Sequence, residues 1–307
     1  MSIHPAATKC LRAREKCLSF MPGMQDLQNT AYGPLESSWG AYSPGFLVRS
    51  WLKLLHRMPV SSSFRRLSLW MRKPLKVLLD GWVDIEVWGL RLRLRSRGNL
   101  SEQRLIFMPQ FLDRVEREVL AKELKDGGLF LDIGANAGLY SLWVASLRLE
   151  NVRVEAFEPD PELCQGLKFN LETNELYTVR VNPLALGRQQ GQMRLIKGSG
   201  NKGENRVAAD DLSEELGLSV EMTTLGDFLR QHGITQISAI KIDIEGYEVD
   251  ALEPFFTDCP ENMWPRLLIC EVVHDTDCKL LQLLERSGYR LAAKERLNSI
   301  FKRELKP

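Results

Sequence analysis

The stretch of sequence that decides the fold is G-L-F-L-D-I-G-A-N-A-G-L-Y, residues 128–140. A short apolar run ends in Asp132, and an amphipathic stretch covers 139–149. Between them, small or turn-forming residues stand at alternate positions: Gly134, Asn136 and Gly138. The segment therefore predicts a buried strand, a tight turn and a helix. Glycines allow a left-handed backbone and the close approach of a ligand, and the start of the helix has free N–H groups.

A turn of this kind, at the carboxyl end of a strand, is where open α/β sheets bind nucleotides. The motif G-x-N-x-G differs from the dinucleotide fingerprint G-x-G-x-x-G, because position 139 is Leu. A strand–helix turn that needs its glycines only for backbone geometry is the alternative interpretation.

Length and composition place the chain among globular proteins. Its 307 residues allow one large or two modest domains, and 44% hydrophobic and 26% charged residues are ordinary values. The net charge of +1 points to no partner, but its distribution is uneven. Residues 1–79 contain 12 basic and 3 acidic residues, whereas the rest of the chain has a net charge of −8.

Six cysteines are scattered along the chain without a C-x-x-C pair, and no histidine cluster completes a zinc pattern. We expect reduced, structural thiols, among them buried Cys164 and Cys270, and hence a cytoplasmic location. No apolar run reaches the roughly 18 residues of a membrane-spanning helix. The first residues have no apolar core of a secretory signal.

We expect three segments. Residues 1–45, rich in Pro, Gly, Ser and Ala, predict a disordered tail. Residues 46–79 predict basic amphipathic helices broken by Pro59 and Pro74. Their apolar faces pack on the protein's own core or bind the inner face of a membrane peripherally. No nucleic-acid partner is expected, because no recognition motif accompanies the charge.

Residues 80–307 predict one α/β domain: a hairpin and helix over 80–126 and a nucleotide-binding core over 127–307. The hairpin, 82–96, has one apolar and one basic face, and a helix over 109–125 starts at Pro109. In the core, strands and helices alternate, which indicates a parallel sheet covered by helices on both faces. Its expected strands are 129–133, 152–157, 178–182, 237–244 and 267–273, finished by an antiparallel pair at 289–292 and 300–304.

Acidic residues follow several of these strands, at the sheet edge where such folds bind ligands. Glu158 lies 26 residues after Asp132, close to the offset of about 20 at which a carboxylate binds a nucleoside ribose. Glu158 as a helix N-cap is the alternative, although Asp160 suits that role better.

The strand I-K-I-D-I-E-G-Y-E, residues 240–248, places Lys241, Asp243 and Glu245 on one face. Ionisable groups are costly to bury without partners, so they indicate a site. A simple ion pair of Lys241 with Asp243 or Glu271 is the alternative. After the next strand, His274 is either a general base or a surface residue that caps the following helix.

Together these segments resemble the FkbM family of S-adenosylmethionine-dependent methyltransferases, in order and over roughly residues 82–292. The motifs that carry the resemblance are L-D-I-G-A-N-A-G-L-Y-S (131–141), A-F-E-P (156–159), V-N-P-L-A-L-G (181–187), T-T-L-G-D-F-L (223–229), I-K-I-D-I-E-G-Y-E (240–248) and I-C-E-V-V (269–273). One departure is Gly226, where the family usually carries Asp. The neighbouring Asp227 points elsewhere on its helix.

The resemblance implies a class I, Rossmann-like methyltransferase fold with a mostly parallel seven-stranded sheet. It also implies S-adenosylmethionine as the cofactor and O-methylation of a hydroxyl on a sugar, glycan or secondary metabolite. The residues that it assigns to the methionine end of the cofactor are Asp132, Gly134, Asn136 and Gly138. Glu158 would hold the ribose, and Pro183, Leu184 and Ala185 would flank the adenine.

A hydroxyl acceptor must lose its proton as the methyl group arrives. Asp243, Glu245 and His274 are the candidate bases, beside Lys241, and Asp243 is preferred because it ends a central strand next to the cofactor turn. The polar loop 198–206 is either a lid over the acceptor or an ordinary surface loop.

Two other functions compete with this one. A NAD-dependent oxidoreductase would use the same sheet edge, but the missing third glycine and the K-I-D-I-E-G segment argue against it. A non-catalytic peripheral membrane protein would use the helices of 46–79.

Overall fold

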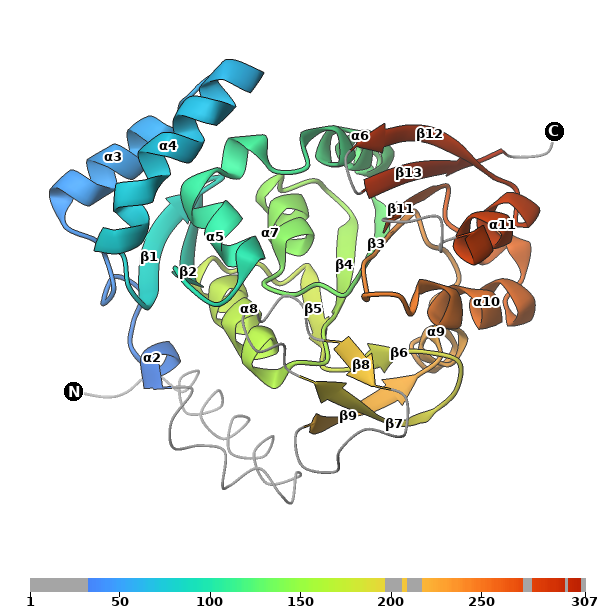
Figure 1. Ribbon diagram of the computed structural model, residues 1–307. Helices are drawn as coiled ribbons and strands as arrows, with labels where there is room; N and C mark the ends of the chain where they lie inside the picture. Colours follow the sequence, from blue (N-terminus) through green and yellow to red (C-terminus); the bar gives the residue numbers. More distant parts are fainter. Residues whose placement is uncertain (1–32, 197–205, 209–216, 273–277, 296–297, 305–307) are drawn as a thin grey trace. The chain divides into compact units, whose positions relative to one another are not determined.

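The computed structural model describes most of the chain (Figure 1). The described residues are 33–196, 206–208, 217–272, 278–295 and 298–304. The chain divides into two units, Met1–Ser38 and Trp39–Pro307. In the first unit the structure describes one helical turn, α2 (Gly33–Glu36). The second unit begins at Trp39, so it includes seven residues, 39–45, that the sequence assigned to the tail; the division into three segments otherwise stays a prediction.

The predicted seven-stranded, mostly parallel sheet is confirmed, with the order β12-β13-β11-β10-β3-β4-β5. Its five parallel strands are β3 (Gly128–Ile133), β4 (Val152–Phe157), β5 (Val179–Asn182), β10 (Ala239–Ile242) and β11 (Leu267–Glu271). The predicted terminal pair, β12 (Tyr289–Glu295) and β13 (Asn298–Arg303), is antiparallel, and β13 is also antiparallel to β11. The order runs outward from β3 to β5 and resumes at β10 on the other side of β3, so a topological switch point lies between β3 and β10.

Helices cover both faces of this sheet, as the alternating pattern predicts. One face packs against α6 (Arg114–Leu124), α7 (Leu139–Ser146) and α8 (Pro161–Thr173), and the other against α9 (Leu225–Gln231), α10 (Glu248–Asp258) and α11 (Cys278–Arg286). The side chains of β3 alternate between the two cores: Phe130 belongs to the first, and Leu129 and Leu131 to the second.

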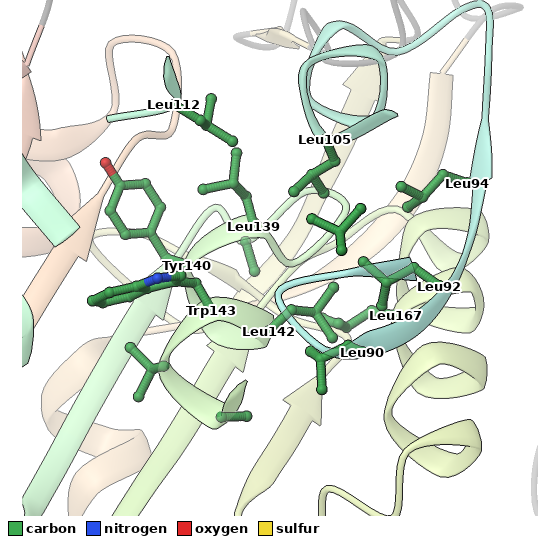
Figure 2. Close-up of a cluster of buried hydrophobic side chains, with 14 of the residues drawn as sticks. Leu90, Leu92, Leu94, Leu105, Leu112, Leu139, Tyr140, Leu142, Trp143 and Leu167 are labelled. Carbon is green, nitrogen blue, oxygen red and sulfur yellow. The ribbon is translucent and has the colours of Figure 1, made fainter. Parts of the chain in front are cut away.

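The first core continues into the N-terminal elements. Apolar side chains from β1 (Trp82–Val87) and β2 (Leu90–Arg95), α5 (Leu100–Phe107), α7 and α8 meet there, as Figure 2 shows for Leu92, Leu105, Leu142 and Leu167. The predicted hairpin is confirmed as the antiparallel pair of β1 and β2. The amphipathic hairpin therefore buries its apolar face against helices of the nucleotide-binding core.

Two predicted helix boundaries are wrong. The helix expected over 109–125 is a 3-10 turn (Pro109–Phe111) followed by α6, because Asp113 takes a left-handed conformation with φ 38°. Helix α3 (Phe46–His56) ends before Pro59, but α4 (Ser62–Leu78) runs through Pro74. Pro74 has no N–H to donate to the carbonyl of Trp70. Both residues are exposed, so water can satisfy that carbonyl.

The basic face predicted for the hairpin is exposed only in part: Arg91 is exposed, whereas Arg93 is not. Arg93 is fully buried, and its guanidinium donates to both carboxylate oxygens of Asp84, at 2.7 and 2.8 Å. The rings of Tyr42 and Phe169 lie 4.7 and 4.4 Å from it. Two close hydrogen bonds and two aromatic neighbours compensate the desolvation of this cation.

Side chains of α8 and of its C-cap form hydrogen bonds with the backbone at the outer edge of β2. Asn170 accepts from the backbone N–H of Arg93 at 2.7 Å and donates to its carbonyl at 3.2 Å. One helical turn later, Asn174 makes the same pair of bonds with Arg91, at 2.8 and 2.7 Å. On the β1 side, Asp84 donates its backbone N–H to the carbonyl of Tyr42 at 3.0 Å.

A second, four-stranded sheet follows β5. Its order is β6-β9-β7-β8, with β6 (Ala185–Leu186), β7 (Gly191–Ile196), β8 (Arg206–Ala208) and β9 (Gly217–Thr223). Strands β7 and β9 pair with each other in this sheet and are antiparallel. The loop expected as a lid, 198–206, lies outside the described residues except for Arg206.

Candidate active site

The glycine turn after β3 is shaped by the protein's own packing. Gly134 and Gly138 have φ values of +75° and +79°. A Cβ on Gly134 would lie 2.0 Å from the carbonyl oxygen of Asp243, and one on Gly138 would lie 2.2 Å from Leu167 Cδ1. Both positions therefore favour glycine whether or not a ligand binds. The turn also lies in close contact with the backbone at the end of β10.

Asn136, between the two glycines, ties this turn to the N-terminal elements. Its φ is +52°, and its Oδ1 accepts from Ala137 N at 2.8 Å and from Asn99 Nδ2 at 2.6 Å. Asn99 in turn caps α5, because its Oδ1 accepts from the backbone N–H of Glu102 at 3.1 Å. Sequence reasoning missed Asn99; the spacing N-x-x-E, typical of a helix start, was the available signal.

Asp132, the last polar residue of β3, is fully buried. Its Oδ2 accepts from Ser141 N at 3.0 Å and from Ser141 Oγ at 2.6 Å. Its Oδ1 has no hydrogen-bond partner among the described residues. Burial raises the pKa of this carboxyl, opposed by the Lys241 ammonium and the Ser141 hydrogen bonds. A buried acceptor without a donor is costly, so this oxygen is suited to an external donor.

Glu158 lies directly after β4 and is buried. Its Oε2 accepts from Asn136 N at 2.7 Å and its Oε1 from Asp160 N at 2.9 Å. Burial raises its pKa to about 7 against these two backbone hydrogen bonds. Asp160, as predicted, is the N-cap of α8 and accepts from Glu162 N at 2.8 Å. Each oxygen of Glu158 keeps a second lone pair for another donor.

Lys241 and Asp243 are brought together at the end of β10. The Lys241 Nζ lies 3.2 Å from Asp243 Oδ2 and 3.4 Å from the carbonyl oxygen of Gly134, and 5.5 Å from the centre of the Tyr140 ring. Burial opposes the charged ammonium, but the carboxylates of Asp243 and Asp132 outweigh it and raise the pKa of Lys241. Of the two predicted partners of Lys241, the direct ion pair is with Asp243.

Glu271, at the end of the neighbouring β11, completes the group. It is half-buried, and its carboxyl is hydrogen-bonded to that of Asp243. Burial, followed by the negative charge of Asp243, raises the pKa of Glu271 to about 7. Glu271 therefore keeps its proton up to near-neutral pH, beside the negative charge of Asp243 and the Lys241 ammonium group. The sequence signal for Glu271 was its position at the same sheet edge.

A cavity of about 630 Å³ opens at this group. Lys241, Asp243 and Glu271 line it where β10 and β11 end, together with Tyr140 of α7. The lining also contains four arginines from the N-terminal elements and α6: Arg65, Arg66, Arg104 and Arg114. Three further acidic residues, Asp113, Glu116 and Glu295, line it as well. The cavity is thus lined by charges of both signs.

Glu245 does not line this cavity. Strand β10 ends at Ile242, so the expected alternation stops before Glu245, which is exposed in a left-handed conformation with φ 55°. Glu248 holds this turn together, because its Oε1 accepts from the backbone N–H groups of Ile244 and Gly246 at 2.9 and 3.3 Å. His274 lies outside the described residues.

The residues expected near an adenine differ in exposure. Pro183 is exposed and Leu184 half-buried, whereas Ala185 is buried in β6 with Leu195 and Val220. Farther along the chain, a Cβ on Gly226 would lie 3.2 Å from Cys259 Sγ. Beside it, Asp227 bonds Thr224 and Arg230, as expected for a residue that points away from Gly226. Within the described ranges, no three His, Cys, Asp or Glu residues are placed to hold a metal ion.

The strand order, the antiparallel β13 beside β11 and the ligand edge at the switch point define a class I S-adenosylmethionine-dependent methyltransferase. The family model named Methyltransferase FkbM domain matches residues 132–291, and the chain belongs to this family. S-adenosylmethionine is therefore its methyl donor, and the alternative of a NAD-dependent oxidoreductase is excluded.

The sequence identity between this chain and individual relatives is low. The chain is 27% identical over 231 residues to the 31-O-demethyl-FK506 methyltransferase FkbM of Streptomyces tacrolimicus, covering 64% of this chain and 85% of that relative. It is 26% identical over 159 residues to the methyltransferase sdnD of Sordaria araneosa, covering 42% and 61%. Among solved structures, the METTL16 methyltransferase domain aligns with a TM-score of 0.44 and 14% identity over 84% of this chain and 90% of that one. Among the described residues, no helix is long and apolar enough to cross a membrane.

Proposed function

We propose that the protein transfers a methyl group from S-adenosylmethionine to a hydroxyl oxygen of a small-molecule or glycan acceptor bound in the 630 Å³ cavity. The observation that carries the proposal is the group of Lys241, Asp243 and Glu271 on the wall of that cavity, beside the glycine turn. The cavity has the size of a small-ligand site. One relative is named for 31-O-demethyl-FK506, a name that specifies an oxygen acceptor.

The residues around the glycine turn fit the cofactor. Asp132 Oδ1 is a buried acceptor without a donor in the described structure, and the ammonium group of the methionine portion would supply one. The free lone pairs of Glu158 suit ribose hydroxyls, and Asn136 N–H already fixes that carboxyl. Pro183, Leu184 and Ala185 remain the proposed neighbours of the adenine. When bound, the cofactor supplies a methyl group on a positively charged sulfur.

The proton of the acceptor hydroxyl is proposed to pass to the Asp243–Glu271 pair. The carboxylate of the pair would take the proton of the acceptor O–H group as its oxygen bonds the methyl carbon, while the bond from that carbon to the donor's sulfur would break and leave a neutral thioether. A group that titrates near 7 is suited to this transfer at neutral pH. Lys241 holds Asp243 in place and balances the charge of the pair. Of the other predicted bases, Glu245 lies away from the cavity lining.

The experiment compares Asp243→Asn and Glu271→Gln with the unmodified chain. Calorimetric titration with S-adenosylmethionine measures cofactor binding, and a labelled-methyl screen against glycosides and cell-envelope glycans measures transfer. We expect binding within a few-fold of the original, and transfer reduced by about 10²-fold or more. Glu295→Gln, on the same cavity wall, is the matched control and keeps transfer. Full transfer by both variants excludes the pair as the base, and methylation of amines in place of hydroxyls contradicts the acceptor class.

A further inference from the structure

Helices α3 and α4 carry an exposed apolar surface. Of the thirteen large hydrophobic side chains exposed among the described residues, nine belong to these helices and the short link between them. We call this set the docking surface: Phe46, Leu47, Leu54, Val60, Phe64, Leu67, Trp70, Val77 and Leu78. Leu47, Trp70 and Val77 have 80, 68 and 77% of their surface exposed. Large apolar side chains exposed in this number on one pair of helices indicate an interaction site.

The docking surface is distinct from the faces that attach the two helices to the domain. Leu52 and Leu55 of α3 and Leu75 of α4 are buried in the main core. The ring of His56 is 2.7 Å from the carbonyl oxygen of Ile106, and Lys76 donates to Gln103 at 2.7 Å. Both helices are thus fixed to α5 by other side chains. The sequence allowed two interpretations of these helices, and packing against the core is one of them. This packing explains the buried face of each helix, but it does not explain the docking surface.

The charge around the docking surface has one sign. Residues 46–79 contain eight Lys and Arg and not a single Asp or Glu. On α4, Leu67, Trp70 and Val77 follow helical spacing along one side, and the exposed cations Arg66 and Lys73 border them. A surface of apolar residues bordered by cations matches an anionic lipid interface, where the apolar groups enter and the cations meet headgroups.

We propose that α3 and α4 dock the protein on an anionic lipid bilayer, with both helices lying in the headgroup region. A bilayer is favoured over a protein groove because uniform positive charge along both helices specifies no register. The indole of Trp70 is of the type that partitions to this interface. Ser61, Arg65 and Arg66 of this segment also line the cavity, so docking brings the bilayer next to the cavity. The proposal holds whichever acceptor is methylated, because it is argued from the exposed side chains of α3 and α4.

The test is vesicle flotation of the full chain. Vesicles of phosphatidylcholine alone are compared with vesicles that also contain about 30 mol% phosphatidylglycerol. We expect at least about tenfold stronger binding to the anionic vesicles, largely lost at about 0.5 M salt because the headgroup attraction is screened. Equal binding to both vesicle types, or no binding to either, overturns the proposal.

Two double variants separate the apolar and the basic contributions. Leu47→Ser with Trp70→Ser removes exposed apolar groups, and Arg49→Glu with Lys73→Glu reverses exposed charges outside the cavity lining. Each should lower binding to anionic vesicles by about tenfold or more, with unchanged thermal unfolding and cofactor binding. Tyr177→Ser, at an 84% exposed aromatic outside the docking surface, is the control and keeps vesicle binding. Undiminished binding by both double variants places the lipid contact elsewhere in the chain and refutes the proposal.

Discussion

Replacing Glu271 by Gln should reduce the loss of folding stability that occurs as the pH rises from about 4.5 to about 7. The pKa of Glu271 is raised from an ordinary 4.5 to about 7 by burial and by Asp243. Between those two pH values the folded state binds more protons than the unfolded state, so stability falls as pH rises from 4.5 through 7. The neutral amide of Gln has no such titration.

The size of the effect follows from the two pKa values. A difference of about 2.5 pH units corresponds to about 3 kcal/mol. Because Glu271 is only half-buried, contact with solvent reduces this to about 1.5 kcal/mol. The stability of Glu271→Gln relative to the unmodified chain should therefore increase by about 1.5 kcal/mol between pH 5 and pH 8. The pKa of Glu158 is also raised to about 7, but its effect is common to both proteins and cancels.

The assay is urea unfolding followed by tryptophan fluorescence, at pH values from 5 to 8 and without cofactor. Glu150→Gln, an exposed carboxyl in the loop before β4, serves as the control, and its difference from the unmodified chain should stay constant with pH. A constant difference for Glu271→Gln as well, or a decrease toward pH 8, would refute the argument that burial and the charge of Asp243 raise the pKa of Glu271.

Three further substitutions test the framework of the site. Gly134→Ala should destabilise the fold by about 3 kcal/mol or more in urea unfolding, because its Cβ would meet the carbonyl of Asp243 in a left-handed backbone; a loss below about 1 kcal/mol would contradict the close approach. Asn99→Ala should cost about 1–2 kcal/mol and weaken S-adenosylmethionine binding in calorimetry, whereas unchanged binding would show that the cap of α5 does not support the turn. Asp84→Ala should cost about 3–5 kcal/mol because it removes the carboxylate that accepts two hydrogen bonds from the buried Arg93 guanidinium, and adding Arg93→Met should recover part of that loss; if the double variant is no more stable than Asp84→Ala, the pairing argument fails.

The main features of the sheet were readable from the sequence because they are local. The strand, turn and helix around Gly134 follow from an apolar run, glycines and a periodic stretch within a few residues. Helix α5 escaped prediction since Leu105, Ile106 and Phe107 are consecutive and show no helical period. The burial of Arg93 depends on Asn170 and on Phe169, far along the chain, and no local pattern encodes such a contact.

In the candidate site too, features set by neighbouring residues were predicted, whereas contacts between residues far apart in the chain were not. The placement of Lys241 and Asp243 on one face was predicted, since alternate residues of a strand share a face, and their ion pair was one of the alternatives. Glu245 was placed on that face wrongly, because the strand ends three residues earlier and the backbone turns through a left-handed conformation. The bond between Asn99 and Asn136 joins positions 37 residues apart and becomes visible only once the fold brings them together.

The side chains that bond the outer edge of β2 have a consequence for how the protein behaves at high concentration. A two-stranded ribbon normally offers unpaired backbone groups to strands of other molecules, which is a common origin of aggregation. Here Asn170 and Asn174 occupy such groups on β2, and Tyr42 occupies one on β1. A helix and a turn thus act as internal caps, so the hairpin can remain outside the main sheet without recruiting a neighbouring chain.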